Sequence, residues 1–153
     1  DMRDGLVHGF VHDPAAAMLG GVSGHAGLFS DSKSLAILMK MLSNGGVYNG
    51  VRYLKKETIT QFTSKQSRDS RRGIGWDKPE FNRRYVNSAS DYASTMCFGH
   101  TGFTGTMVWA DPKYDLIYVF LSNRVYPSQE NKKLLRQNVR TNIMDVIYES
   151  FLQ

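Results

Sequence analysis

The chain has 153 residues and a net charge of +5, and 41% of its residues are hydrophobic and 22% charged. This balance excludes a disordered chain, which would combine low hydrophobicity with high net charge. No apolar run reaches the roughly 18 residues that a membrane helix needs, so we expect no integral membrane segment. The single cysteine, Cys97, excludes an intrachain disulfide framework and a cysteine-based zinc site.

The first part of the chain predicts a looped segment followed by a helix. Residues 1–29 contain six glycines, which favour loops, with one helical turn over residues 15–19. A helix is expected over residues 31–43, with Ser30 as its N-cap. Its apolar residues repeat at helical spacing: Leu35, Leu38, Met39 and Leu42.

A hairpin, a short helix and a long loop are expected next. The Asn-Gly pair within residues 47–53 predicts a tight turn, and residues 55–62 predict a helix. Residues 63–95 are polar and basic and predict a loop, in which only residues 73–76 could form a strand. We expect little of this loop to be anchored in the core. Acidic residues interleave with its arginines, so we expect no nucleic-acid partner.

The last third of the chain predicts two strands and a helix. Residues 105–110 and 116–122 are rich in β-forming residues, and the turn residues Asp111-Pro112-Lys113-Tyr114 separate them. The second strand is apolar on both faces, which predicts a central strand covered on both sides. A long helix is expected over residues 130–152. Its apolar stripe comprises Leu135, Val139, Ile143, Ile147 and Phe151.

These elements indicate an α+β fold, an antiparallel sheet with flanking helices and a long C-terminal helix. The sheet has few strands, so the chain is interpreted as part of a larger sheet domain.

Two patterns near the start of the chain suggest chemistry but have plainer explanations. His8-x-x-x-His12-Asp13 has metal-ligand residue types, but the intervening residues favour an extended chain that separates the rings, so no metal site is expected. Gly21-Val22-Ser23-Gly24-His25 nearly matches the G-x-S-x-G nucleophile elbow. His25 replaces the last glycine and no strong strand precedes it, which favours a simple glycine loop.

Two further patterns imitate serine hydrolase motifs. Ser30-x-x-Lys33 matches S-x-x-K, in which a lysine takes the proton of a nucleophilic serine. Tyr85-x-Asn87 matches the Y-x-N element of the same enzymes. Ser30 is fully explained as a helix cap and Lys33 as a solvated helix position, and this interpretation is favoured over a nucleophile.

The strongest signal lies in residues 98–105, Phe-Gly-His-Thr-Gly-Phe-Thr-Gly, directly before a predicted strand. Three glycines, two threonines and a histidine suit a site where a substrate lies against the backbone. Backbone N–H groups could stabilise an oxyanion there, and His100 could hold or relay a proton. A glycine-kinked strand with a core histidine explains the same residues, and these residues alone leave both readings open.

The chain resembles the C-terminal part of class C β-lactamase-like serine hydrolases, a superfamily that includes penicillin-binding proteins. The branch that it resembles is bacterial and is sometimes fused to a β-N-acetylglucosaminidase-like glycoside hydrolase domain. Beside Gly99–Gly105, the resembling segments occur in the family's order: Val11–Ala16, Leu19–Ser30, Gly73–Asp77, Trp109–Pro112 and Leu121–Arg124.

The resemblance implies roles for residues of the 98–105 segment. His100-Thr101-Gly102 is similar to the family's K-T-G element, with histidine replacing lysine. The backbone N–H of Phe103 would belong to the oxyanion hole, and Thr104 and Gly105 would contact the substrate. No metal or organic cofactor is implied.

The resemblance also implies that Ser30 and Tyr85 are not the family's catalytic serine and tyrosine. In the family, the segment similar to residues 24–29 follows both motifs. We therefore expect the nucleophile to lie before Asp1. Residues 1–153 would then be the C-terminal part of a single domain, inactive alone and partnered by its N-terminal part.

The implied reaction is hydrolysis of an amide or ester through an acyl-enzyme. Peptidoglycan-derived peptides are the favoured substrates, β-lactams are also considered, and the implied compartment is extracytoplasmic. The alternative is a catalytically silent module that binds cell-wall material or a protein partner.

Overall fold

The structure is a computed structural model that describes residues 5–82 and 84–152, and the chain divides into two compact units, Asp1–Asp31 and Ser32–Gln153. The first unit contains the short helix α1 (Pro14–Met18). Asp13 caps it, because a carboxylate oxygen of Asp13 accepts a hydrogen bond from the Ala16 N–H at 2.8 Å. Pro14 occupies the first helical position, where no N–H is needed. The predicted helical turn is confirmed.

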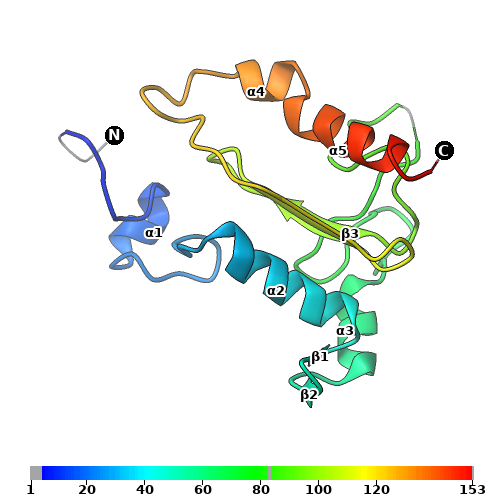
Figure 1. Ribbon diagram of the computed structural model, residues 1–153. Coiled ribbons are helices and arrows are strands. Elements are labelled where there is room, and N and C mark those ends of the chain that lie inside the picture. Colours follow the sequence, from blue (N-terminus) through cyan, green and yellow to red (C-terminus); the bar gives the residue numbers. More distant parts are fainter. Residues whose placement is uncertain (1–4, 83, 153) are drawn as a thin grey trace. The chain divides into compact units, whose positions relative to one another are not determined.

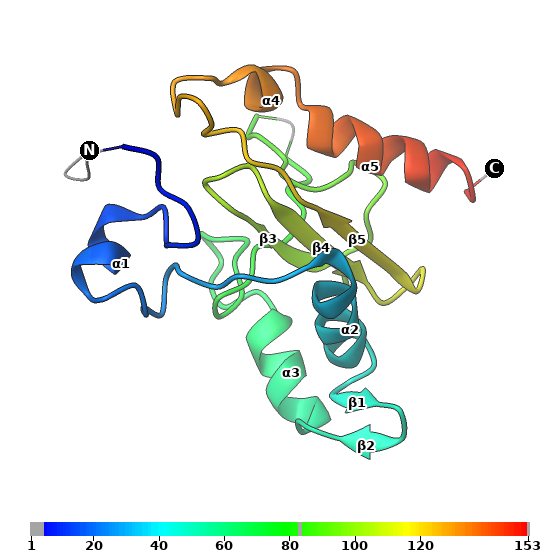
Figure 2. The same ribbon diagram turned by 60° about the vertical axis from the view of Figure 1, so that its left-hand side comes forward.

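The second unit combines helices with two antiparallel sheets, which confirms the α+β fold (Figures 1 and 2). Its elements in chain order are α2 (Ser32–Ser43), β1 (Val47–Tyr48), β2 (Val51–Arg52), α3 (Lys56–Thr63), β3 (Phe98–Thr101), β4 (Met107–Asp111), β5 (Leu116–Phe120), α4 (Lys133–Arg136) and α5 (Val139–Glu149). No helix within the described ranges is long and apolar enough to cross a membrane.

Two local predictions in this unit are confirmed and one is wrong. Strands β1 and β2 form the expected hairpin, and its central residues Asn49 and Gly50 have φ values of 48° and 76°, as a tight turn of this kind requires. Helix α3 lies within one residue of its predicted bounds. Helix α2 begins at Ser32, so Asp31 and not Ser30 precedes its first residue.

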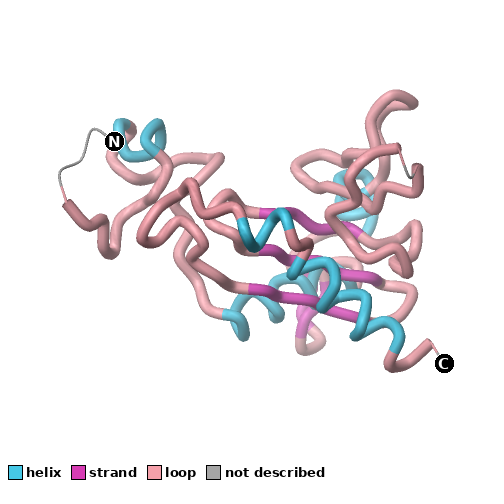
Figure 3. Tube along the Cα trace, turned by 90° about the horizontal axis from the view of Figure 1, so that it is seen from above, coloured by secondary structure: helices cyan, strands magenta, loops and turns pink. Residues whose placement is uncertain are grey.

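Helices cover both faces of the three-stranded sheet, whose order is β3-β4-β5 (Figure 1). On one face, Met39 of α2 packs with Phe98, Ala110 and Ile117. On the other face, α5 lies over the strands, as the view from above shows (Figure 3). Its core residues are Met107, Trp109, Tyr118, Met144 and Tyr148. Side chains of β4 alternate between these faces, as the period of a strand requires.

The strand predicted over residues 116–122 is covered on both faces as expected, but among the described residues it lies at an edge of the sheet and not at its centre. Strand β4 is central, and β5 pairs only with β4 among the residues that the structure describes. The apolar run of β5 still has a clear cause, because Ile117 faces the α2 side and Tyr118 the α5 side. A strand buried on both faces reads as continuously apolar whether or not both of its edges are paired.

The predicted terminal helix is broken in two. Asn138 has a left-handed conformation with φ of 49°, and this separates α4 from α5. The fully buried side chains of α5 are Met144 and Tyr148, whereas Ile143 of the predicted stripe is 41% exposed. The buried face of α5 is therefore offset by one residue from the predicted stripe.

The long loop before β3 is anchored in the core, contrary to expectation. Residues 73–76 form no strand, but Asp77 pairs with Gly99 as an isolated bridge. Further along, Ala89 and Ser90 are fully buried, and Ala93 joins the core on the α5 side of the sheet. Small side chains provide these anchors, which explains why hydrophobicity did not reveal them.

Candidate functional site

The strongest sequence signal forms a β-hairpin. Residues 98–101 are themselves strand β3, and the turn after them leads into β4. The Gly102 N–H donates to the Thr106 carbonyl at 2.8 Å, and the Gly105 N–H donates to the Gly102 carbonyl at 3.0 Å. Gly105, predicted as a strand residue, lies in this turn with φ of 103°, which favours glycine.

Gly99 allows β3 to approach β4 beneath a large ring. Its register partner is Trp109, which is fully buried. A Cβ built on Gly99 would lie 2.5 Å from Cδ2 of Trp109 and would also collide with the Val108 carbonyl. The glycine therefore has a packing role and places His100 and Thr101 along a closely packed strand.

The outer edge of β3 presents the backbone of Thr101. Gly99 exchanges both backbone hydrogen bonds with Asp77, at 2.8 and 3.0 Å. Because successive residues of a strand direct these groups to opposite edges, the N–H and C=O of Thr101 point to the same side as those of Gly99, away from β4. Within residues 5–82 and 84–152, only the Asp77 bridge pairs with this edge.

His100 is exposed, so the alternative of a core histidine is wrong. Its Nδ1 lies 2.8 Å from the Thr101 carbonyl oxygen, and its Nε2 lies 3.4 Å from Nη1 of Arg72. A carbonyl only accepts hydrogen bonds, so Nδ1 carries the proton and Nε2 presents a lone pair toward the guanidinium. Both contacts fix the ring beside the edge of β3.

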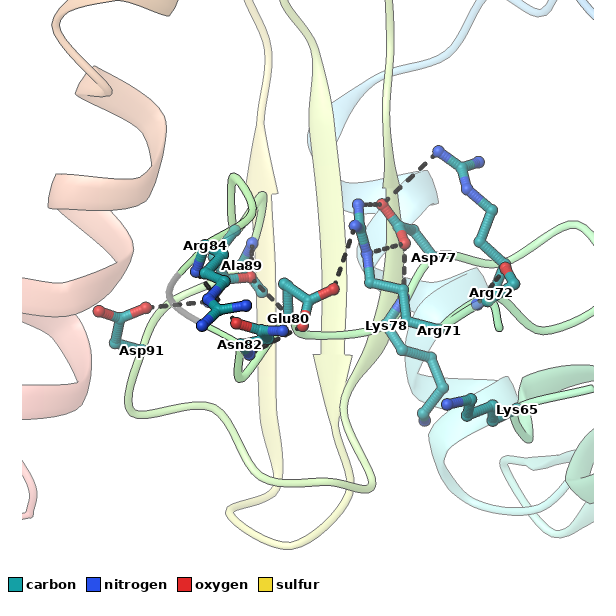
Figure 4. A network of polar contacts seen from close by, with 12 residues as sticks. Lys65, Arg71, Arg72, Asp77, Lys78, Glu80, Asn82, Arg84, Ala89 and Asp91 are labelled. Carbon is teal, nitrogen blue, oxygen red and sulfur yellow. Dashed lines mark hydrogen bonds and ion pairs between the residues drawn. The ribbon is translucent and has the colours of Figure 1, made fainter. Parts of the chain in front are cut away.

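A buried carboxylate, Asp77, binds Arg71 and lies near Arg72, the arginine that contacts this histidine (Figure 4). Asp77 is 4% exposed and receives two hydrogen bonds from Arg71, at 2.7 and 2.9 Å. Arg71 also contacts Glu80 at 3.7 Å, and Nη2 of Arg72 lies 3.9 Å from Asp77. Because Asp77 is shared with Arg71, Arg72 keeps an exposed cationic surface, with 55% of its side chain accessible.

The charges of this network shift the pKa values of its members. Burial alone would raise the pKa of Asp77, but the hydrogen bonds and charge of Arg71 outweigh it and lower the pKa below its ordinary value. The same hydrogen bonds raise the pKa of Arg71. Asp77 and Arg71 therefore both carry their charges at neutral pH.

The turn residues of the candidate site are held by arginines from other elements. Phe103 is 63% exposed, and the Arg124 guanidinium lies 4.7 Å from its ring centre. The Thr104 carbonyl accepts a hydrogen bond from the Arg124 N–H at 2.9 Å. Arg140 donates to the Gly105 carbonyl at 3.3 Å. Hydrogen bonds from the segment after β5 and from α5 therefore hold the conformation of the turn.

The two imitations of serine hydrolase motifs are used locally. The Ser30 hydroxyl contacts the carbonyl of Asp31, at 3.5 Å. The Asn87 side chain accepts from the Glu80 and Ala89 N–H groups at 3.1 and 3.0 Å, which organises its own loop. Tyr85 is 64% exposed. Within the described residues of the second unit, no contact joins Tyr85 or Asn87 to His100.

Asp13 of the His8-x-x-x-His12-Asp13 pattern has a structural role. Within the described part of the chain, no three His, Cys, Asp or Glu side chains gather as a metal site would require. Asp13, the third residue of that pattern, caps α1 and contacts His25 instead.

Comparison with known proteins identifies the fold that builds this site. Residues 3–142 match the model of the family described as Beta-lactamase. The chain belongs to the beta-lactamase family. This assigns it to a family of serine hydrolases and confirms the resemblance drawn from residues 99–105 and the accompanying segments.

Curated relatives support the same assignment. Proteins named "Putative D-alanyl-D-alanine carboxypeptidase" from Salmonella typhi, Salmonella newport and Salmonella heidelberg are each 38% identical over 143 residues. These alignments cover 86% of this chain and 33% of each relative. The chain therefore spans about a third of the length of these relatives.

Sequence reasoning missed the arginines at this site. Arg72 belongs to the predicted basic loop, yet it reaches His100, and Asp77, which the family resemblance includes, pairs with the neighbouring Gly99. The available signal was the position of an Arg-Arg pair and an aspartate on either side of Gly73–Trp76.

Proposed function

We propose that the edge of β3 binds the acyl donor of a serine hydrolase that acts through an acyl-enzyme on amides or esters. An extended substrate would lie along the edge as an additional strand and pair with the backbone of Thr101. Strand addition of this kind aligns a peptide over several residues. It therefore supports peptidoglycan-derived peptides as the favoured substrate class, with β-lactams as smaller compounds of the same reaction type.

The roles of the site residues follow from this placement. His100 would contact the substrate beside the strand edge. Gly102 would let the backbone approach the substrate closely. The backbone N–H of Phe103 would stabilise the oxyanion of the tetrahedral intermediate. Thr104 and Gly105 would contact the substrate in the part of the turn that Arg124 and Arg140 bind. No metal or organic cofactor enters the proposed reaction.

The observation that carries this proposal is the cation beside His100. Arg72 lies 3.9 Å from Asp77, reaches Nε2 of His100 at 3.4 Å and has 55% of its side chain exposed. A substrate carboxylate placed there could accept hydrogen bonds from the guanidinium. We infer that Arg72 recognises a carboxylate of the substrate, as a peptide that ends in a free acid would supply.

We propose that the catalytic serine and lysine of this reaction lie outside residues 1–153. Ser30 precedes α2 by two residues and contacts a backbone carbonyl, which is no arrangement for a nucleophile. We therefore propose that the chain supplies one wall of the site in a longer protein. Peptidoglycan-derived substrates would place that protein outside the cytoplasm, and a fused glycoside hydrolase domain stays a prediction.

Binding to the 153-residue chain tests the proposal without requiring turnover. The probe is an N-acylated D-alanyl-D-alanine peptide, compared with the same peptide as its C-terminal amide. We expect the acid to bind more tightly, and Arg72→Gln to weaken it by about 10- to 100-fold, the value of one charge-assisted hydrogen bond. Arg68→Gln, which changes an exposed arginine of the same loop, is the matched control.

Two results would contradict the carboxylate role. These are equal affinities for acid and amide, or equal effects of the Arg72 and Arg68 substitutions. Hydrolysis of the same peptide by the full-length protein then separates an enzyme from the alternative, a silent module. Binding without turnover there would favour a module that holds cell-wall material.

A further inference from the structure

The first unit of the chain contains a second cluster of chemically active side chains, independent of the β3 edge. Oγ of Ser23 lies 2.7 Å from Nδ1 of His25. Nε2 of the same ring lies 2.9 Å from a carboxylate oxygen of Asp13. A serine, a histidine and an aspartate are therefore joined in a row by two hydrogen bonds, one on each ring nitrogen.

The proton positions in this row follow from the aspartate. The Ala16 N–H bond, and then the hydrogen bond of His25, lower the pKa of Asp13 below its ordinary value, so the carboxylate only accepts hydrogen bonds. Nε2 of His25 must then carry the ring proton. In the neutral ring, Nδ1 then presents its lone pair to Ser23, whose hydroxyl is the donor across 2.7 Å. This is the arrangement that a general base needs to activate a serine.

We propose that Ser23 is a nucleophile that accepts acyl groups from small activated esters, with His25 as its general base. Oγ of Ser23 attacks the ester carbonyl carbon while its proton passes to Nδ1 of His25. When the carbon–oxygen bond of the ester breaks, Nδ1 returns that proton to the departing alkoxide. The products are acyl-Ser23 and an alcohol, and water can later release the acid by the same proton path.

Access to this serine is open on the side of its neighbours. A Cβ built on Gly24 would meet nothing within 4 Å, and Val22 is 88% exposed. The side chains of His25 and Asp13 are 53% and 39% exposed. An open site selects little, so the substrate class is defined by a good leaving group and small size rather than by a particular acyl chain.

A fluorophosphonate probe tests the proposal on the 153-residue chain. Oγ forms a bond to phosphorus, fluoride leaves, and His25 takes the proton, so the adduct is stable and can be mapped by mass spectrometry. We expect one adduct, on Ser23, and a roughly 10²-fold slower reaction in His25→Gln, a typical contribution of general-base catalysis. Ser30, an exposed serine of the same unit, is the internal control, and Ser30→Ala should leave the rate unchanged.

Two further variants separate chemistry from folding. Asp13→Asn retains an acceptor for the Ala16 N–H, so α1 stays capped, but it removes the carboxylate. We expect the labelling rate to fall about tenfold. In His25→Gly, added imidazole should restore labelling of Ser23, which a purely structural role of the ring would not produce. An adduct on His25, equal labelling of Ser30, or an unchanged rate in His25→Gln would overturn the proposal.

Discussion

A buried carboxylate on β4, that of Asp111, joins three parts of the second unit by hydrogen bonds. Asp111 is 1% exposed and accepts four hydrogen bonds. One oxygen accepts from the Ser94 hydroxyl at 2.6 Å and the Lys113 N–H at 3.1 Å. The other accepts from the Ser94 N–H at 2.7 Å and the Tyr148 hydroxyl at 2.8 Å. These bonds join the long loop, the β4–β5 turn and α5.

We predict that Asp111→Asn destabilises the chain by about 2–5 kcal/mol. Asparagine keeps one carbonyl oxygen, so one backbone N–H faces an amide NH2 and loses its acceptor, the hydroxyl beside it must turn to accept, and the remaining hydrogen bonds lose their charged acceptor. Each unsatisfied buried donor costs about 1–3 kcal/mol. Tyr148→Phe removes a single donor and leaves the carboxylate with three, so we expect it to cost about 1 kcal/mol.

Urea unfolding, followed through the fluorescence of the buried Trp109, measures both changes. At a slope of about 1.5 kcal/mol per molar urea, the Asp111→Asn midpoint should fall by about 1–3 M. In the double variant, the loss should be smaller than the sum, because both substitutions affect one hydrogen bond. A single-variant loss below about 0.5 kcal/mol, or strict additivity, would refute the reasoning.

Three further predictions concern the backbone at Gly99 and Asn138 and the charge of Asp77. Gly99→Ala should cost about 1–3 kcal/mol, because its Cβ meets the Trp109 ring, and calorimetry should show a lower melting temperature. Asn138→Ala should cost about 1 kcal/mol of unfolding free energy, while Asn138→Gly should be neutral or stabilising, because φ is 49° there. The pKa of Asp77 is lowered in the folded chain, so its stabilising contribution is complete above about pH 4 and is lost as pH falls through the folded pKa. The difference in unfolding free energy between wild type and Asp77→Asn should therefore shrink on acidification, whereas a constant difference would exclude this origin.

Local patterns predicted most of the elements of this fold. The Asn49-Gly50 turn, the short helix after Asp13 and the turn at residues 111–114 each depend on a few adjacent residues, and the structure contains all three. The break at Asn138 could not be predicted in the same way. Apolar spacing continues through that residue, and only packing against the sheet decides which face of α5 is buried.

The candidate site was predicted where it follows from one segment and missed where it depends on two. His100 and Thr101 stand out within residues 98–105, and family resemblance gave them roles. Arg72 lies 28 residues earlier and reaches His100 only because Asp77 pairs with Gly99. No periodicity links these positions, so a basic loop was the natural interpretation of the arginines.

Ser23 illustrates a different limit of motif reasoning. The sequence argues against a nucleophile elbow here, because His25 replaces the last glycine of the motif and no strong strand precedes the turn. The final glycine and the preceding strand define only one of the backbone conformations that can expose a nucleophilic serine. The proton relay depends instead on which nitrogen of a nearby ring holds a lone pair, and here Asp13, ten residues before the serine, decides it. The residue that breaks the motif therefore supplies the base, and its chemistry is visible only once the loop has folded back onto the cap of α1.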